Sequence, residues 1–281
     1  MDKPSPQVDE IPNDNFEAPK LPKEKDFQQK EDEYPVEVKS NEISNHSDEG
    51  DEVSEAQIQM SVRAGFIRKV YGILSIQLLI TFGFVFICQI MPIKYLILRN
   101  PAFSGNLIIF SSFMFLFLFL CLACCRGLSR KVPYNYLFLT AITLCEAISC
   151  SIASSIYSFQ IVALALILTI VATLTITFYA CTTKKDFSTW RVGLYCIFMQ
   201  MVTFGMIAVL FKIRALYSFY TFCSTIIVGI YLIYDTQLIM GKLGVGYSVD
   251  DYIFATLEIY MDIIRLFLLI LRILGNSSRR R

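Results

Sequence analysis

Seven stretches of mostly apolar residues occur in this 281-residue chain, and they constrain its fold more than any other feature. A helix of about 20 such residues crosses the hydrocarbon core of a bilayer, which is roughly 30 Å thick. Hydrophobic residues make up 55% of the chain and charged residues only 17%, a bias that a soluble domain of this length does not need. We therefore expect an all-α integral membrane protein. Its spans are predicted at residues 70–91, 106–125, 134–156, 160–182, 190–211, 215–240 and 252–274.

Charge divides the chain into parts. Residues 1–60 contain 17 acidic and six basic residues, whereas residues 61–281 contain seven acidic and 19 basic ones. The first segment has few aromatic residues and no apolar period, so it cannot bury enough apolar surface to offset the entropy of ordering. We expect a disordered acidic tail at 1–60, a membrane domain at 61–275 and a basic C-terminal tail at 276–281.

The Lys and Arg residues of the loops predict the orientation. If the N-terminus is cytosolic, the cytosolic loops hold nine of these residues and the opposite loops four. Seven crossings would then place Arg279, Arg280 and Arg281 on the far side, against the same rule. Two alternatives stay open for the last segment: it crosses, or it is re-entrant and returns. Basic residues spread one to three per loop fit lipid headgroups, so the expected partner is the bilayer and not nucleic acid.

The nine cysteines lie in or beside the apolar segments, without a disulfide-like spacing. Cys121 and Cys124 form a lone CxxC with no second pair and no His nearby, so a zinc site is not expected. Most of these cysteines are interpreted as small apolar residues. Cys124 and Cys125 end a span beside Arg126, which makes them candidates for palmitoylation.

Ionisable residues at bilayer depth cost about 3 kcal/mol each on insertion scales, and they usually face a cavity or a partner. Four acids qualify: Glu146 in the third span, Asp235 in the sixth, and Glu258 and Asp262 in the seventh. Asp235 lies roughly 9 Å from the end of its span, and Asp262 roughly 15 Å from the same face. Consecutive helices joined by a short loop are normally antiparallel neighbours, so Asp235 and Asp262 should approach each other.

Two close carboxylates in a poorly solvated site cannot both ionise cheaply, so this pair is expected to hold a shared proton and titrate as a unit. Such a pair senses pH, and its ionised oxygens attract Ca²⁺, a hard cation with oxygen ligands. The alternative is a helix–helix hydrogen bond that only fixes packing. Glu258 and Arg265 lie one turn to either side of Asp262. A self-neutralising cluster with Arg265 is the favoured interpretation of Glu258, and the Arg265 cation favours the ionised form of Asp262.

Several runs of residues carry a resemblance to a known family. They are 63–71 (RAGFIRKVY), 74–81 (LSIQLLIT), 131–133 (KVP), 183–187 (TKKDF), 233–241 (IYDTQLIMG), 251–255 (DYIFA) and 259–264 (IYMDII). These runs resemble the transmembrane Bax inhibitor motif family, specifically its Lifeguard branch. The resemblance covers about residues 60–275 and leaves the N-terminal segment uncovered.

The resemblance implies a seven-helix fold with its last helix surrounded by the others. It also implies a pH-sensitive Ca²⁺ leak from intracellular stores, with Ca²⁺ as permeant ion and no cofactor, and suppression of apoptosis with apoptosis-regulating membrane proteins as partners. The implied location is the endoplasmic reticulum or Golgi, with the plasma membrane as the alternative. The paired aspartates of the family fall on Asp235 and Asp262, and an acid implicated in ion passage falls on Asp250 or Asp251. Glu146 matches an acid that many members keep.

This chain departs from the family at two positions, since Asn is common where Glu258 and Arg265 stand. A second hypothesis is therefore a non-conducting membrane scaffold that restrains death signalling through protein contacts. A third is an intramembrane aspartyl protease, which also places one Asp on each of two neighbouring helices. Tyr234 and Asp235 fit half of that pattern, but Asp262 is not preceded by Gly-x-Gly and no Pro-Ala-Leu segment follows. We therefore expect no enzymatic activity.

Overall fold

The structure, a computed structural model, describes residues 44–124, 127, 130–185, 187, 191–211, 214–242 and 247–278. The chain divides into two compact units, residues 1–53 and residues 54–281. In the first unit the described residues, 44–53, are helical. The second unit contains all seven apolar segments and every candidate site residue.

Every regular element of the described residues is a helix, and the seven long helices match the seven predicted spans. Their ends differ from the predicted ones by a few residues, except at the start of the first helix. The long helices are α1 (Ser44–Cys88), α3 (Pro101–Cys124), α5 (Tyr134–Ser155), α6 (Phe159–Thr182), α7 (Arg191–Phe211), α8 (Arg214–Met240) and α9 (Tyr252–Ser278). The short elements are α2 (Met91–Arg99) and a 3-10 turn, η2 (Val249–Asp251).

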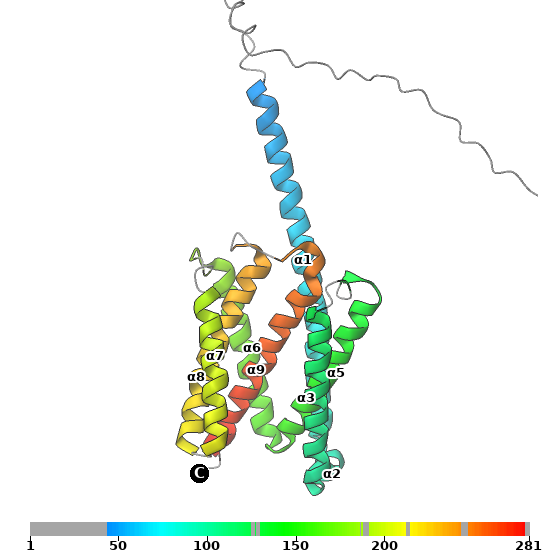
Figure 1. The fold of residues 1–281 in the computed structure, drawn as a ribbon, viewed down its shortest axis with the longest axis vertical. Coiled ribbons are helices and arrows are strands. Elements are labelled where there is room, and N and C mark those ends of the chain that lie inside the picture. The colour runs from blue at the N-terminus through cyan, green and yellow to red at the C-terminus, as the bar shows by residue number, and fades with distance from the viewer. Residues whose placement is uncertain are drawn as a thin grey trace, which may run out of the picture. The chain divides into compact units, whose positions relative to one another are not determined.

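Five helical stretches are long and apolar enough to cross a membrane by length and composition: Gln57–Cys88 in α1, all of α3, α5 and α6, and Ala215–Met240 in α8. In α7 the apolar stretch is shorter, Val192–Ala208. Four charged side chains lower the hydropathy of α9. Both helices nevertheless run alongside the other five in the same bundle (Figure 1). The protein is thus an all-α integral membrane protein with seven bundled hydrophobic helices.

The bundle has two ends, which we name after residues that lie there. The Arg63 end holds the last residues of α6 and α8 and the first residues of α9, whereas the α2 end holds α2, the start of α8 and the end of α9 (Figure 1). The 27 residues of α9 form an unbroken helix, about 40 Å long at 1.5 Å per residue. It runs from the Arg63 end to the α2 end, so the re-entrant alternative is wrong.

Some predicted boundaries differ from the ends of the described helices. Disorder was expected as far as residue 60, but α1 begins at Ser44. Residues 44–60 contain no Pro, and lengthening an existing helix adds a hydrogen bond per residue without a new nucleation cost. Residues 1–43 lie outside the described residues. At the other terminus the expected tail at 276–281 begins inside α9, which continues to Ser278.

The connection after the first span, predicted as a loop, contains the helix α2. Pro92 stands in its first turn, where the missing N–H leaves no helical hydrogen bond unmade. The helix stops at Arg99, before Asn100 and the Pro101 that opens α3. Pro92, Lys94, Arg99 and Pro101 made this segment look like a short loop, which is why its helical period was not recognised.

The central helix of the bundle is α9, as predicted for the last segment. It packs against α5, α6 and α8. From α1, the Thr81 hydroxyl lies 2.7 Å from the Tyr260 hydroxyl, and the Phe82 ring packs edge-on against Phe267 with centroids 5.3 Å apart. The fully or almost fully buried side chains of α9 include Ile253, Leu257, Ile264, Phe267 and Leu271.

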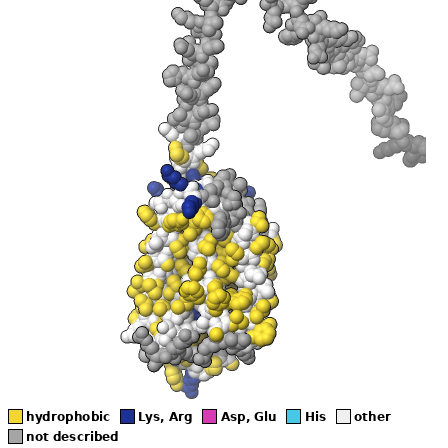
Figure 2. Space-filling view, turned by 90° about the vertical axis from the view of Figure 1, so that its left-hand side faces the viewer, with side chains coloured by type: hydrophobic (Ala, Val, Ile, Leu, Met, Phe, Trp, Pro, Cys, Tyr) yellow, Lys and Arg dark blue, Asp and Glu magenta, His cyan; other side chains and the backbone are white. Residues whose placement is uncertain are grey.

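Large apolar side chains cover the outside of the bundle. Leu79, Phe113, Phe178 and Leu210 are each more than two thirds exposed. Figure 2 shows hydrophobic side chains over the flank of the bundle, with Lys and Arg gathered toward its ends. This distribution suits a lipid environment, where the hydrocarbon takes the place of a protein core and the charges reach the headgroups.

The joint between α8 and α9 is fixed by a glycine cap and by Arg63. Gly241 has a φ of 72°, which glycine adopts without strain, and its N–H donates to the Leu238 carbonyl at 3.1 Å. Arg63 of α1 donates to the carbonyls of Leu238 and Tyr247, at 2.8 and 2.9 Å. A Cβ at position 241 would lie 3.1 Å from the Arg63 guanidinium, so glycine also leaves room for this contact.

Candidate functional site: an aspartate pair in a membrane cavity

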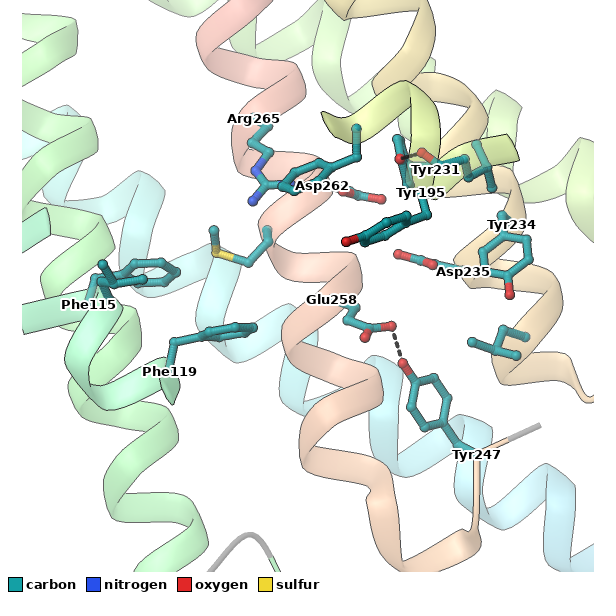
Figure 3. Close-up of a pocket in the computed structure, with 15 residues that line it drawn as sticks. Phe115, Phe119, Tyr195, Tyr231, Tyr234, Asp235, Tyr247, Glu258, Asp262 and Arg265 are labelled. Carbon is teal, nitrogen blue, oxygen red and sulfur yellow. Dashed lines mark hydrogen bonds between the residues drawn. The ribbon is translucent and has the colours of Figure 1, made fainter. Parts of the chain in front are cut away.

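Asp235 of α8 and Asp262 of α9 lie together inside the helix bundle, nearer its Arg63 end. Both are buried, with exposed fractions of 8% and 5%. Their carboxyl groups point toward one another (Figure 3) and are close enough to interact directly. The antiparallel order of α8 and α9 places them at similar depth, as the helix order predicts.

Buried polar contacts fix the rotation of α8 about its axis. Gln237 is fully buried and lies on the side of α8 away from Asp235. Its Nε2 donates to the Lys185 carbonyl at 3.0 Å, and its Oε1 accepts from the Phe187 N–H at 3.4 Å. Because these bonds tie one face of α8 to the segment after α6, the opposite face presents Asp235 to α9.

A cavity of about 640 Å³ lies beside the pair. Residues of α3, α7, α8 and α9 form its walls, and its charged groups are Asp235, Glu258, Asp262 and Arg265. This volume holds several waters or a hydrated ion, because one water occupies about 30 Å³ in the liquid. Aromatic rings form much of the wall, namely Phe115, Phe119, Tyr195, Phe198, Tyr231, Tyr234 and Tyr247.

One oxygen of the pair lacks a partner. Oδ2 of Asp262 is buried and accepts no hydrogen bond from any described residue. A carboxylate oxygen removed from water without a donor is costly. A proton, a water molecule or a cation at Oδ2 would remove that cost.

Glu258 lies one turn before Asp262 and lines the same cavity. The Tyr247 hydroxyl donates a hydrogen bond to its carboxylate (Figure 3). Burial raises the pKa of Tyr247, and the nearby Glu258 raises it further, so the hydroxyl stays protonated and remains a donor.

The expected Glu258–Arg265 cluster is not present, since no ion pair joins these residues. They are seven residues apart, which is about 10 Å along a helix. At that separation Tyr247 provides the nearer donor for Glu258.

Arg265 acts on the pair from a distance. It is exposed and makes no ion pair with a described residue. In Figure 3 the Asp262 carboxylate points toward Asp235, whereas the Arg265 guanidinium lies on the side of α9 toward Phe115 of α3. It remains within electrostatic reach of both aspartates and of Glu146. The predicted influence of Arg265 on Asp262 is therefore a longer-range electrostatic one, and it does not come from an ion pair.

The other acidic candidates lie outside the cavity. Glu146 of α5 is partly buried and does not line it, and Asp250 is exposed in the turn before α9. Asp251 accepts from Nε and Nη2 of Arg130, with N–O distances from 2.9 to 3.2 Å. This ion pair ties the start of α9 to the segment before α5 at the Arg63 end.

The two palmitoylation candidates have different standing. Cys124 ends α3 as an exposed free thiol, which an acyltransferase could reach. Cys125 lies outside the described residues.

Two parts of the site were missed in the sequence. Tyr247 stands in a Gly-rich connection without periodicity, and only the tertiary fold brings it to Glu258. The aromatic wall on α3 gave no separate signal either, because the chain holds 23 Phe and 15 Tyr spread through its spans. The contacts of Arg63 at the joint of α8 and α9 were also not predicted, although Arg63 opens the first run that resembles the family.

The donor set at the pair is small for a metal ion. In the described parts of the chain, no group of three or more His, Cys, Asp or Glu side chains is arranged to hold a metal ion. Carboxylate oxygens suit Ca²⁺, but a bound Ca²⁺ takes 6–8 oxygen ligands, more than the two aspartates provide.

These features define the class of protein: a seven-helix membrane protein with an ionisable pair inside the bundle. Comparison with known proteins gives the family. Residues 63–279 match the Bax1-I family, described as inhibitor of apoptosis-promoting Bax1, and the chain belongs to this family. The resemblance in the sequence runs is thereby confirmed.

Named relatives resemble this chain over most of its length. Protein lifeguard 3 of Homo sapiens is 34% identical over 224 residues, which cover 77% of this chain and 70% of that protein. Protein lifeguard 3 of Mus musculus is 35% identical over 224 residues, covering 77% and 71%. Golgi anti-apoptotic protein of Vaccinia virus (strain Lister) is 28% identical over 227 residues, covering 81% and 92%.

Proposed function

We propose that this protein is a pH-sensitive Ca²⁺ leak pathway of an intracellular membrane and a negative regulator of apoptosis. The observation that carries the proposal is the buried Asp235–Asp262 pair beside a cavity, with Oδ2 of Asp262 lacking a partner. The apoptotic part is supported by the description of the family and by the name of the viral relative. Ca²⁺ is the permeant ion, and the proposal includes no cofactor.

The proton of the pair is the proposed switch. Two neighbouring carboxyl groups in a buried site are most stable when they share a proton, and the shared proton joins α8 to α9. Loss of the proton leaves two like charges that repel each other and attract a divalent cation. The conductance is therefore expected to follow the protonation state of the pair.

Arg265 opposes this flow. It lines the cavity of the pair, so a cation that enters this cavity meets its guanidinium. Two like unit charges at 4 Å repel by about 4 kcal/mol at an effective dielectric constant of 20. A slow leak, in which Arg265 must swing aside for each ion, fits this arrangement better than rapid conduction.

The proposed location is the membrane of the endoplasmic reticulum or Golgi, with the N-terminus in the cytosol. The word Golgi in the name of the viral relative supports this location. Because seven helices run through the bundle and α9 does not turn back, the C-terminus then lies in the lumen. Protease protection of terminal epitope tags in sealed vesicles tests the orientation, and two equally accessible tags would contradict it.

Flux through liposomes tests the leak. The purified protein is reconstituted around an entrapped Ca²⁺ indicator, and the leak is measured from pH 5 to pH 8, roughly the interval in which perturbed carboxyl pairs exchange protons. The wild type is expected to change its flux with pH. Asp235→Asn/Asp262→Asn should give a flux that no longer varies with pH, because neither amide ionises.

The control for this experiment is Arg68→Gln, which removes a charge that is exposed and does not line the cavity. It should behave like the wild type. If the double variant leaks like the wild type at every pH, the pair does not gate the flux.

A non-conducting scaffold is the second candidate function, and the Arg265 cation in the cavity favours it. This candidate predicts that cells expressing Asp235→Asn/Asp262→Asn remain as protected from apoptosis as cells expressing the wild type. Flux and protection measured in the same variants separate the two functions. The relatives are named as regulators and not as enzymes, which supports a protein without protease activity.

A further inference from the structure

A second cavity, of about 420 Å³, lies between α7, α8 and α9. We call it the α7–α9 groove. Helix α8 packs against both α7 and α9. The groove lies between α7 and α9, with α8 as its floor. Met201 and Val202 of α7 face Leu268 and Leu269 of α9 across it. Val202 is 47% exposed, so the groove is open to the surrounding lipid along α7.

The charge of the α7–α9 groove is positive, in contrast to the cavity with the aspartates. Arg265 and Arg272 line it, two turns apart on α9, and no acidic side chain does. Arg272 makes no ion pair with a described residue, and its guanidinium lies 5.0 Å from the centre of the Tyr217 ring. Tyr217 stands in the first turn of α8 at the α2 end. The Arg272 side chain therefore reaches toward the membrane surface at that end, as long basic side chains do.

The described residues of the α2 end include no acidic residue. Their segments are 86–105, 150–165, 205–211, 214–220 and 266–278, and none of them contains Asp or Glu. Lys94, Arg99 and Arg272 are basic residues of the same described segments. A basic surface without acids attracts anionic headgroups, by about 1 kcal/mol for each charge near the membrane.

A buried hydroxyl without a partner lies at the depth of Arg272. Ser224 of α8 is 1% exposed and lines the groove, and its Oγ has no hydrogen-bond partner in the described part of the chain. From the Asp235–Asp262 pair, Ser224 is 11 residues and Arg272 is 10 residues toward the α2 end, in antiparallel helices. The groove thus offers a hydrogen-bond donor, Ser224, and a cation, Arg272, at the same depth. Its apolar part, between Val202 and Leu268, adjoins them.

We propose that the α7–α9 groove binds a phospholipid with an anionic headgroup. Its phosphate lies at Arg272, an ester carbonyl accepts from Ser224, and an acyl chain runs between α7 and α9 as far as Arg265. Charge complementarity selects this occupant, because a neutral apolar helix would leave the guanidinium and the hydroxyl without partners. The site is independent of the proposed Ca²⁺ leak.

Native mass spectrometry of the full-length protein tests the site. The protein, purified in detergent, is titrated with phosphatidylglycerol and, separately, with phosphatidylcholine. The wild type is expected to retain one phosphatidylglycerol more strongly than the following ones. Arg272→Gln should weaken retention of that molecule about tenfold, the effect of losing one charge-assisted hydrogen bond, and Arg272→Lys should keep part of it because the charge remains.

Two further variants separate the effect of a basic charge at this end from the effect of the groove itself. Arg99→Gln removes a basic residue of the same end that lies over the Tyr95 ring and does not line the groove, and it should bind like the wild type. Val202→Trp fills the groove from its open side with all charges kept, and it should lose the retained lipid. Melting temperatures of the variants show that they are folded.

Several results would overturn the site. They are equal retention of phosphatidylcholine and phosphatidylglycerol by the wild type, equal losses in Arg272→Gln and Arg99→Gln, or an unchanged Val202→Trp. A dimer that Val202→Trp dissociates would also overturn it, because a second copy of the chain would then be the occupant.

Discussion

The two ends of the bundle hold α9 by different kinds of contact. At the Arg63 end, cations bind backbone or carboxylate oxygens beside α9: Arg63 at the end of α8 and at Tyr247, and Arg130 at Asp251. At the α2 end, Lys94 also binds a backbone oxygen, that of Tyr157, but α9 itself meets a steric fit there, since Gly275 packs against the Tyr157 ring. Hydrogen bonds and ion pairs can break and form again one at a time. A close steric fit, in contrast, leaves no room for a larger side chain or for a shifted helix. The Arg63 end is therefore the end at which α8 and α9 can move without loss of the fold.

The largest expected effect comes from breaking the steric fit. A Cβ at position 275 would lie 2.0 Å from Cε1 of Tyr157, so Gly275→Ala forces α9 away from the segment after α5. We expect a loss of about 3 kcal/mol, the upper part of the range for overpacking, measured as a lower Tm in detergent.

Gly83→Ala is the matched control, since no atom lies within 4 Å of a Cβ there. It should be neutral or slightly stabilising. The double variant Gly275→Ala/Tyr157→Ala should recover part of the loss, and a melting curve of Gly275→Ala equal to the wild type would show that the α2 end is not sterically fixed.

The next effect concerns the Arg63 clamp. Arg63→Gln removes two charge-assisted hydrogen bonds to the carbonyls of Leu238 and Tyr247. We expect a loss of about 2 kcal/mol, and a faster leak if movement of the α8–α9 joint opens the pathway. Arg68→Gln, an exposed Arg in the same helix, is the control, and equal effects of the two substitutions would contradict the clamp.

A smaller effect is expected within the site itself. Tyr247→Phe removes only the hydroxyl that donates to Glu258, which costs about 1 kcal/mol. The released Glu258 should shift the pH at which the flux changes, because it shares the cavity with Asp262. Flux measured against pH checks this expectation, with Tyr95→Phe as the control at the α2 end; an unchanged pH profile would exclude Glu258 from the switch.

The smallest effect belongs to the ion pair of Arg130 and Asp251, whose side chains are 44% and 23% exposed. Pairs open to solvent contribute roughly 0.2–1 kcal/mol. A double-mutant cycle with Arg130→Gln and Asp251→Asn should give a coupling energy in that range that falls with added salt. Coupling above about 2 kcal/mol would mean that this clamp is as strong as that of Arg63.

The sequence predicted those features that depend only on position along a helix. Spans follow from apolar length, and the approach of Asp235 to Asp262 follows from two antiparallel neighbours of known rise per residue. The direction of a side chain around its helix is harder, and Arg265 illustrates why. Spacing alone suggested contact with the acids beside it, but Asp262 turns to α8 and Arg265 to the side of α3 (Figure 3). Tyr247 could not be assigned, because a connection without periodicity has no face to predict.

The charges of α9 bear on how the protein is made. Asp262 and Arg265 stand near its middle, where such residues together cost roughly 6 kcal/mol on insertion scales, and α9 is absent from the helices that are apolar enough to cross a membrane by composition. A helix of this kind does not partition into lipid by itself. It enters only if helices already in the membrane receive its polar face, as α8 does with Asp235 and α1 with Thr81. The segment that carries half of the site is synthesised after the other six long helices, and its insertion depends on the assembly of the helices before it.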